Sequence, residues 1–206
     1  MELLWAPETL IAIAFGYLMG SIPFGLILSR LAGYGDIRQI GSGNIGATNV
    51  LRTGNRWLAA ATLLLDAGKA AAAVLIVRYF VPEPPLAYSF AGIAAFVGHI
   101  YPVWLGFKGG KGVATYIGAM MAINWIVGLL FCVVWLMIAW TRRLSSLAAL
   151  TAAATAPIFA FLWSGTHLAT GAALMSALLI YKHRANIGRL IQGTEPRIGE
   201  DRKAAG

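Results

Sequence analysis

The sequence predicts an all-α integral membrane protein. Of its 206 residues, 59% are hydrophobic and only 12% are charged, which leaves too few polar side chains to cover a soluble domain of this size. Long apolar runs recur along the chain, and most approach the roughly 20 residues that a helix needs to cross a bilayer. We therefore expect one integral membrane domain over residues 1–206 and no soluble domain.

Six apolar runs predict the membrane helices. They are Leu10–Leu28, Trp57–Val77, Pro85–Leu105, Val113–Trp140, Leu147–Trp163 and Leu168–Ile180. The fourth run, of 28 residues, exceeds one straight span, and Asn124 and Trp125 in its middle predict a tight turn. With that turn the chain has seven transmembrane helices.

The distribution of basic residues supports the seven-helix arrangement. With the N-terminus outside and the C-terminus in the cytoplasm, the interior segments hold 14 of the 16 Lys and Arg residues, all but Lys69 and Arg78, as the positive-inside rule requires. Without the turn only six stay inside. Both halves of the split run are short, so we expect short or re-entrant helices around a cytoplasm-facing site. The net charge of +8 then indicates anionic lipid as a partner rather than nucleic acid.

A few residues inside the apolar runs predict local features of the membrane helices. Pro23 removes a backbone donor and predicts a kink in the first run. Asp66 and Lys69, three residues apart in one helix, are expected to pair, either for structure alone or along a polar cavity. Cys132 is the only cysteine and is expected to pack among apolar residues. No acidic cluster or His/Cys ligand set predicts a metal.

Residues 41–55 read GSGNIGATNVLRTGN, and their first six residues match the dinucleotide spacing G-x-G-x-x-G. Asp66 even lies 20 residues after Gly46, where a ribose-binding acid is expected. Asp66, however, lies in a membrane run, and no buried strand precedes Gly41, so we reject a nucleotide site. The loop offers backbone amides, side-chain donors and a cation for a phosphate, or it is only a polar turn. The donors and the cation are Ser42, Asn44, Thr48, Asn49 and Arg52.

A second glycine-rich segment, GHIYPVWLGFKGGKGVAT, covers residues 98–115. It lacks P-loop spacing, yet Gly109, Gly110 and Gly112 surround Lys111 just before an apolar run. Free amides and a helix N-terminus beside an ammonium group predict an anion site. The alternative is that Lys111 only anchors the helix at the membrane surface. His99 is equally compatible with a structural and a functional role.

The tail segment YKHRANIGRLIQGTEPRIG covers residues 181–199. His183, Asn186 and Arg189 recur every three residues and share one helical face. A basic amphipathic helix on an anionic membrane has the same pattern, although His183 and Asn186 add hydrogen-bonding specificity. In TRRLSSL, Ser145 and Ser146 stand at a predicted helix start, where N-capping is the ordinary explanation.

The chain resembles PlsY, the family of bacterial membrane acyltransferases that use acyl phosphate. The resemblance is carried by GSIPFG and by the three segments above, in that order along nearly the whole chain. It implies transfer of a fatty acyl group from acyl phosphate to the 1-hydroxyl of glycerol-3-phosphate, giving lysophosphatidate and inorganic phosphate, an early step of phospholipid synthesis. It also implies no cofactor, no acyl-CoA or acyl carrier protein, and a multi-pass protein of the bacterial inner membrane with a cytoplasmic active site.

The resemblance also implies which residues form the site. Catalytic roles fall on Ser42, Lys111, His183 and Asn186, and substrate binding falls on Asn44, Thr48, Arg52, His99, Ser146 and Glu195. Ser146 is preferred to its neighbour Ser145. A phosphate oxygen of the substrate is expected to take the proton, with His99 or His183 as the competing base.

Two other functional classes remain as alternatives at this stage. A membrane transporter of an organic phosphate would also use anion-binding broken helices, but it requires polar residues through the bilayer, whereas the candidates here lie on one side. A structural protein of the membrane surface would leave both glycine-rich loops unexplained.

Overall fold

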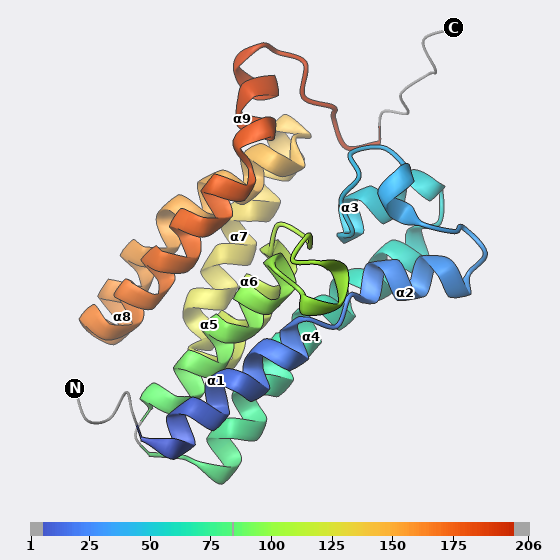
Figure 1. Cartoon of the computed structure of the whole chain (residues 1–206). Helices are drawn as coiled ribbons and strands as arrows, with labels where there is room; N and C mark the ends of the chain where they lie inside the picture. The colour runs from blue at the N-terminus through green and yellow to red at the C-terminus, as the bar shows by residue number, and fades with distance from the viewer. Residues whose placement is uncertain (1–5, 84, 200–206) are drawn as a thin grey trace, which may run out of the picture. The chain divides into compact units, whose positions relative to one another are not determined.

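The computed structural model describes residues 6–83 and 85–199, and every regular element in this part of the chain is a helix (Figure 1). This confirms the all-α class. The described residues divide into two compact units, one ending at Gly128 and the other beginning at Leu129. Arg202 and Lys203, two of the cations predicted on the inner side, lie outside the described residues. The single-domain prediction stays a prediction.

Four apolar helices form the body of the first unit. They are α1 (Pro7–Gly20), α4 (Arg56–Phe80), α5 (Leu86–Ile100) and α6 (Val113–Ile123). Helix α1 packs along α5, and α4 packs along both α5 and α6. Small residues permit the close approach: a Cβ at Gly20 would lie 1.9 Å from the carbonyl oxygen of Ala95. Such contacts are typical of helices that pack within a membrane.

The first apolar run is interrupted at Pro23, where the sequence predicts a kink. Helix α1 ends at Gly20, and α2 (Phe24–Leu31) begins directly after Pro23. Because proline has no backbone N–H and clashes with the preceding turn, it kinks or breaks a helix, and here it separates α1 from α2. The break leaves the Ile22 carbonyl beside α4, where the side chain of Lys69 donates to it at 2.6 Å.

The fourth apolar run is divided at Asn124, as predicted. Helix α6 ends at Ile123, and α7 (Trp125–Arg142) follows. The Asn124 side chain caps α7, because its Oδ1 accepts hydrogen bonds from the backbone N–H groups of Ile126 (3.1 Å) and Val127 (3.2 Å). A polar residue that satisfies the first amides of the next helix stabilises the turn.

The second unit contains α8 (Ser145–Lys182) and α9 (Arg184–Ile191). Gly165 breaks α8 with φ 75° and ψ −166°, a conformation that glycine adopts most readily. The break falls between the predicted runs Leu147–Trp163 and Leu168–Ile180. The buried residues before the break are largely alanines, among them Ala149, Ala153 and Ala160.

Five helical segments among the described residues are long and apolar enough to cross a membrane: Pro7–Leu31, Arg56–Phe80, Leu86–Leu105, Trp125–Arg142 and Ser145–Lys182. Helix α6 is apolar but shorter. The first of these segments contains both α1 and α2, and the last contains the break at Gly165. The count of seven crossings and their orientation stay predictions.

Short helices lie in the polar connections that carry the site candidates. Between α2 and α4 the chain forms the 3₁₀ helix η2 (Ile37–Gln39), helix α3 (Ala47–Val50) and η3 (Leu51–Thr53). The 3₁₀ helix η4 (Val103–Leu105) lies between α5 and α6. Beneath the first connection, Leu26, Ile37, Ile45, Val50 and Ala59 form an apolar cluster, and Leu105 of η4 packs against it. The two polar connections therefore share an apolar base.

Candidate active site

Asn49 shapes the first glycine-rich loop from within. This residue is 2% exposed, and its Nδ2 donates to the carbonyl oxygens of Ile37 (3.0 Å), Ile40 (2.9 Å) and Asn44 (2.8 Å). Its Oδ1 accepts from the backbone N–H of Ser42 at 3.0 Å and from the Ser42 hydroxyl at 3.3 Å. One buried amide thus satisfies the polar groups along the loop. The expectation that Asn49 donates to a phosphate is therefore wrong, because its donors are used within the loop.

The backbone of the first loop requires glycine where it turns. Gly41 has φ +58° and Gly43 has φ +70°, in the left-handed region that most side chains avoid. A Cβ at Gly41 would lie 2.4 Å from Cδ of Arg52, so the Arg52 side chain lies directly against the loop. Arg52 therefore lies beside the Gly41 backbone.

The four predicted residues of this loop gather in one short segment. Ser42, Thr48 and Arg52 are exposed, and Asn44 is half-buried. The Asn44 Oδ1 accepts from the backbone N–H of Gly46 at 2.8 Å, which closes a local turn of the kind that asparagine favours. The structure thus presents two hydroxyls and a guanidinium at an accessible loop, a set suited to a phosphate group.

A cluster of charged side chains lies in the segment that precedes this loop in the sequence. The Asp36 carboxylate accepts from the side chains of Arg38 (Nε, 2.9 Å) and Arg30 (3.1 Å). Hydrogen bonding from Arg38 holds the pKa of Asp36 well below its usual range, and the carboxylate in turn raises the pKa of the Arg38 guanidinium. The Asp36 side chain also accepts from the Arg38 backbone N–H at 3.0 Å, so it caps η2.

The second glycine-rich loop is held by α5. The backbone N–H groups of Gly109 and Gly110 donate to the carbonyl oxygens of Ile100 (3.1 Å) and His99 (3.0 Å). These two amides satisfy carbonyls that the end of a helix otherwise leaves unpaired. The expectation that they face an anion is therefore wrong. Lys111 follows them directly, is half-buried, and stands just before the N-terminus of α6.

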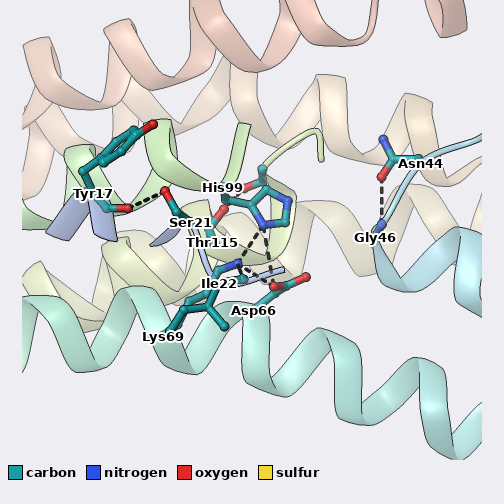
Figure 2. Close-up of polar contacts among 10 residues, drawn as sticks. Tyr17, Ser21, Ile22, Asn44, Gly46, Asp66, Lys69, His99 and Thr115 are labelled. Carbon is teal, nitrogen blue, oxygen red and sulfur yellow. Dashed lines mark hydrogen bonds and ion pairs between the residues drawn. The ribbon is translucent and has the colours of Figure 1, made fainter. Parts of the chain in front are cut away.

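His99 belongs to a buried ionic cluster in the first unit (Figure 2). Its Nδ1 lies 3.0 Å from Nζ of Lys69 and 3.6 Å from Oδ1 of Asp66. Lys69 also donates to Asp66 Oδ1 at 2.7 Å, which confirms the predicted pairing of these two residues. His99 is 4% exposed. The sequence predicts the pair and marks the histidine as a candidate, but it carries no signal that joins them, because they lie on different helices.

The tail candidates gather around Glu195 in the second unit. Asn186 donates to Oε1 of Glu195 at 2.6 Å, and Arg189 donates to Oε2 at 2.7 Å, so two of the three residues predicted to share a face bind one carboxylate. His183, the third, directly precedes α9. His183 is 3% exposed, and its Nδ1 lies 2.8 Å from the carbonyl oxygen of Leu179. Glu195 itself lies just beyond α9.

The charge of Glu195 is stabilised by its neighbours. Burial raises the pKa of this carboxyl group, but its polar neighbours, among them the bonded side chains of Asn186 and Arg189, outweigh burial and lower the pKa below its usual value. Ser146 is 6% exposed, and its Oγ makes no close hydrogen bond to the described residues. We therefore treat this hydroxyl as a neighbour of the carboxylate rather than as a bonded partner. Ser146, not Ser145, is the buried member of the serine pair.

The structure therefore assembles the predicted residues into local groups. In the first unit, Ser42, Asn44, Thr48 and Arg52 occupy one loop, while Lys111 and His99 belong to a second loop and its support. In the second unit, Ser146, Asn186 and Glu195 meet, and His183 lies at the junction of α8 and α9. No three His, Cys, Asp or Glu side chains among the described residues could hold a metal ion.

The comparisons with known proteins agree along the chain. The glycerol-3-phosphate acyltransferase family profile matches residues 10–193. A glycerol-3-phosphate acyltransferase of Mesorhizobium japonicum is 60% identical over 190 residues, covering 92% of this chain and 96% of that protein. One of Rhizobium meliloti is 58% identical over 194 residues, covering 94% of each.

Solved structures of a relative show the same fold. The crystal structure of PlsY (YgiH), an integral membrane glycerol 3-phosphate acyltransferase, in its glycerol 3-phosphate form has a TM-score of 0.87 and 41% identity, covering 93% of this chain and 96% of that one. Its lysophosphatidic acid form has a TM-score of 0.84 and 40% identity, covering 93% and 95%. The chain belongs to the glycerol-3-phosphate acyltransferase family and is an integral membrane acyltransferase.

Proposed function

We propose that the protein transfers a fatty acyl group from acyl phosphate to the 1-hydroxyl of glycerol-3-phosphate, at the cytoplasmic face of a bacterial inner membrane. The observation that carries this proposal is the pair of forms in which the similar PlsY structure is known, one with glycerol 3-phosphate and one with lysophosphatidic acid. These two molecules differ by one acyl group on a hydroxyl. The products are then lysophosphatidate and inorganic phosphate.

The reaction needs charge stabilisation more than a covalent nucleophile on the protein. The substrate hydroxyl attacks the carbonyl carbon of the acyl phosphate, a C–O ester bond forms, and the bond from that carbon to the phosphate oxygen breaks. The hydroxyl proton passes to a phosphate oxygen of the substrate. The leaving phosphate and the substrate phosphate both carry negative charge. Arg52 and Lys111 supply fixed cations for these groups, and Ser42, Asn44 and Thr48 supply hydrogen bonds in the first loop.

The second unit contributes groups that orient substrates. Glu195 holds the Asn186 amide at 2.6 Å, and this contact fixes the direction of the remaining amide atoms. We assign Asn186 and His183 to orientation of the hydroxyl and the acyl phosphate, and Ser146 to binding. Glu195 acts by holding Asn186 in place, a supporting role of the kind that active sites require.

Hydrogen-bond geometry favours His183 over His99 as the protein base that competes with the substrate phosphate. A carbonyl only accepts, so the His183 Nδ1 next to the Leu179 carbonyl carries the hydrogen, and Nε2 is the basic nitrogen of the neutral ring. The Nδ1 of His99 instead faces the Lys69 ammonium, which only donates. The basic nitrogen of His99 is therefore occupied.

The proposed reaction is tested with purified protein in detergent, palmitoyl phosphate and labelled glycerol-3-phosphate, with palmitoyl-CoA as a parallel donor. We expect labelled lysophosphatidate from palmitoyl phosphate and none from palmitoyl-CoA. Absence of product from the acyl phosphate would contradict the assignment of the donor.

The two cations are tested by substitution. Arg52→Ala and Lys111→Ala should each lower kcat/KM by about a hundredfold or more, as removal of one stabilising group does elsewhere. The matched controls are Arg56→Ala and Lys108→Ala, which remove a nearby cation without touching a proposed site residue and should stay near wild type. Wild-type kinetics in both site variants would reject the phosphate roles.

A further inference from the structure

We propose that Asp66, Lys69 and His99 form a positioning cluster that fixes the second glycine-rich loop, and through it Lys111, for the phosphate of glycerol-3-phosphate. The proposal rests on the function proposed above and adds residues that do not touch the substrate. It assigns a role to an ion pair buried within the apolar helices of the first unit.

Lys69 connects three separate parts of the first unit. Its ammonium group lies 2.6 Å from the Ile22 carbonyl oxygen, 2.7 Å from Oδ1 of Asp66 and 3.0 Å from Nδ1 of His99. A lysine has three N–H donors, so these three partners engage all of them. Lys69 is 4% exposed and Asp66 is 2% exposed, and the pairing keeps a costly buried charge balanced. The cluster therefore has one defined arrangement.

The direction of the Lys69 donor fixes the orientation of the His99 ring. Because the ammonium group only donates, Nδ1 of His99 accepts and the hydrogen of the neutral ring lies on Nε2. The Nε2 edge lies against Gly110, where an added Cβ would be 2.0 Å from Nε2. The His99 carbonyl also accepts from the Gly110 N–H at 3.0 Å. His99 thus contacts Gly110 through both ring and backbone, one residue before Lys111.

The other end of the cluster leads to the first loop. Ile22 lies in the break between α1 and α2, and Lys69 bonds the carbonyl that the break exposes. Helix α2 approaches the first loop so closely that a Cβ at Gly25 would lie 1.9 Å from the carbonyl oxygen of Ile45. The Lys69 ammonium group thus links His99, which contacts the second loop, to Ile22, which precedes the helix α2 that lies against the first loop. We expect these Lys69 contacts to set the distance between the proposed phosphate-binding groups of the two loops.

A purely stabilising ion pair would make a different prediction. If the cluster only offset its own buried charges, then removing both charges together would leave the enzyme unchanged. The double variant Asp66→Asn/Lys69→Met does this, since it leaves no unpaired buried charge while it removes the donor to His99 and Ile22. We expect a protein with wild-type elution and helical content whose KM for glycerol-3-phosphate rises about ten- to a hundredfold, because small misplacements of binding groups have effects of that size.

The split between the two substrates distinguishes positioning from loss of folded protein. Fewer folded molecules would lower the apparent kcat and leave both KM values unchanged. A displaced second loop should raise the KM for glycerol-3-phosphate and leave the KM for palmitoyl phosphate within about twofold. Gly68→Ala and Arg78→Met are matched controls on α4: Gly68 has open space around it, and Arg78 is exposed. Both should keep wild-type kinetics.

A double-mutant cycle tests the same proposal with the ion pair intact. In His99→Asn the amide oxygen still accepts from Lys69, but no ring lies under Gly110. Gly110→Ala brings a methyl group against the His99 ring. We expect each single variant to raise the KM for glycerol-3-phosphate and the combined variant to raise it by less than the product of the two effects, because removal of the ring makes room for the methyl group.

The outcomes separate this inference from the proposed function. If the wild-type protein makes no lysophosphatidate from palmitoyl phosphate, the proposed function fails. If the wild-type protein is active but Asp66→Asn/Lys69→Met keeps wild-type KM values, or if the effects of His99→Asn and Gly110→Ala multiply without coupling, the positioning cluster is overturned and the proposed function stands.

Discussion

The two glycine-rich loops of the first unit have similar compositions but are held by different means. The first loop is organised from within, because the Asn49 amide bonds to backbone groups between Ile37 and Asn44. The second is organised from outside, because Gly109 and Gly110 bond to the end of α5 and lie against His99. The first loop therefore depends on a segment of about a dozen residues, and the second depends on the end of α5.

This difference distinguishes a loop that is held by its own side chain from a loop that is held by a neighbouring helix. A loop shaped by one of its own side chains keeps its form even if neighbouring helices shift slightly. A loop attached to a helix end moves with that helix. The position of the second loop therefore depends on α5, which contacts Lys69 of α4, and Lys69 also bonds the Ile22 carbonyl before α2. Two phosphate-binding loops of these two kinds would share one apolar base, to which Leu105 contributes from the second connection.

The largest effect is expected from Asn49→Ala, which tests whether the first loop is organised by that single side chain. The substitution leaves one buried and three partly buried backbone groups without the Asn49 side chain, and a buried group that loses its partner costs about 1–3 kcal/mol, so the loop should lose its form. We expect kcat/KM for glycerol-3-phosphate to fall by about a hundredfold or more, measured in detergent with palmitoyl phosphate.

The control for this variant is Asn55→Ala, because the Asn55 side chain serves the start of α4: its Oδ1 accepts from the backbone N–H of Leu58 at 3.0 Å, and its Nδ2 lies 3.5 Å from the Tyr34 hydroxyl. Asn55→Ala should lower the thermal midpoint slightly and leave kinetics near wild type. Equal kinetic losses in both variants would show that general stability, rather than loop form, explains the effect.

An intermediate effect is expected from one added methyl group in each loop. A Cβ at Gly109 would lie 2.1 Å from the His99 carbonyl oxygen and 2.4 Å from Cδ of Pro102, whereas a Cβ at Gly46 would meet only Oδ1 of Asn44, at 3.1 Å. Gly109→Ala should therefore lower kcat/KM by about tenfold or more, and Gly46→Ala by about threefold or less. The reverse order would contradict the view that the second loop is held by contact with α5.

The smallest effect is expected at the entry to the first loop. The pKa of Asp36 is lowered in the folded protein, so the ionised carboxylate adds stability above its unfolded pKa of about 3.9. That contribution is lost as the pH falls through the lower folded pKa. Asp36→Asn should therefore reduce the thermal midpoint at pH 7. The loss in free energy of unfolding should be less than about 1 kcal/mol, because the Asp36–Arg38 pair is close to the surface.

The pH dependence provides the check on this last variant. The difference in thermal midpoint between Asp36→Asn and the wild type should shrink as the pH is lowered below 3.9, and activity at pH 7 should change by less than about twofold. A difference that grows in acid would have the wrong sign for a carboxylate with a lowered pKa.

Several features of the fold could be predicted from the sequence because they depend on nearby residues. A proline inside a helix kinks or breaks it, and Pro23 separates α1 from α2. Asn124 caps the helix that follows it directly. The pairing of Asp66 with Lys69 needed only the geometry of one helix. The face shared by Asn186 and Arg189 followed from their spacing, although its partner Glu195 came into place only with the turn after α9.

Other features could not be predicted because their partners carry no signal in the sequence. Asn49 bonds backbone carbonyls, and any residue has one, so its role in shaping the loop could not be distinguished from a role in binding phosphate. The amides of Gly109 and Gly110 turn toward α5 for the same reason. The meeting of Lys69 with His99 requires α4 and α5 to pack in one register.

By itself the sequence determined the all-helical membrane class, the breaks at Pro23 and Asn124 and the family, because hydrophobicity, helix breaking and motif order are local properties of the chain. Only the tertiary structure decided which polar groups of each unit meet. In the folded protein His99 contacts Lys69, and the Asn49 amide bonds to the backbone of its own loop. A buried polar group bonds to whichever partner the packed chain brings within hydrogen-bonding distance.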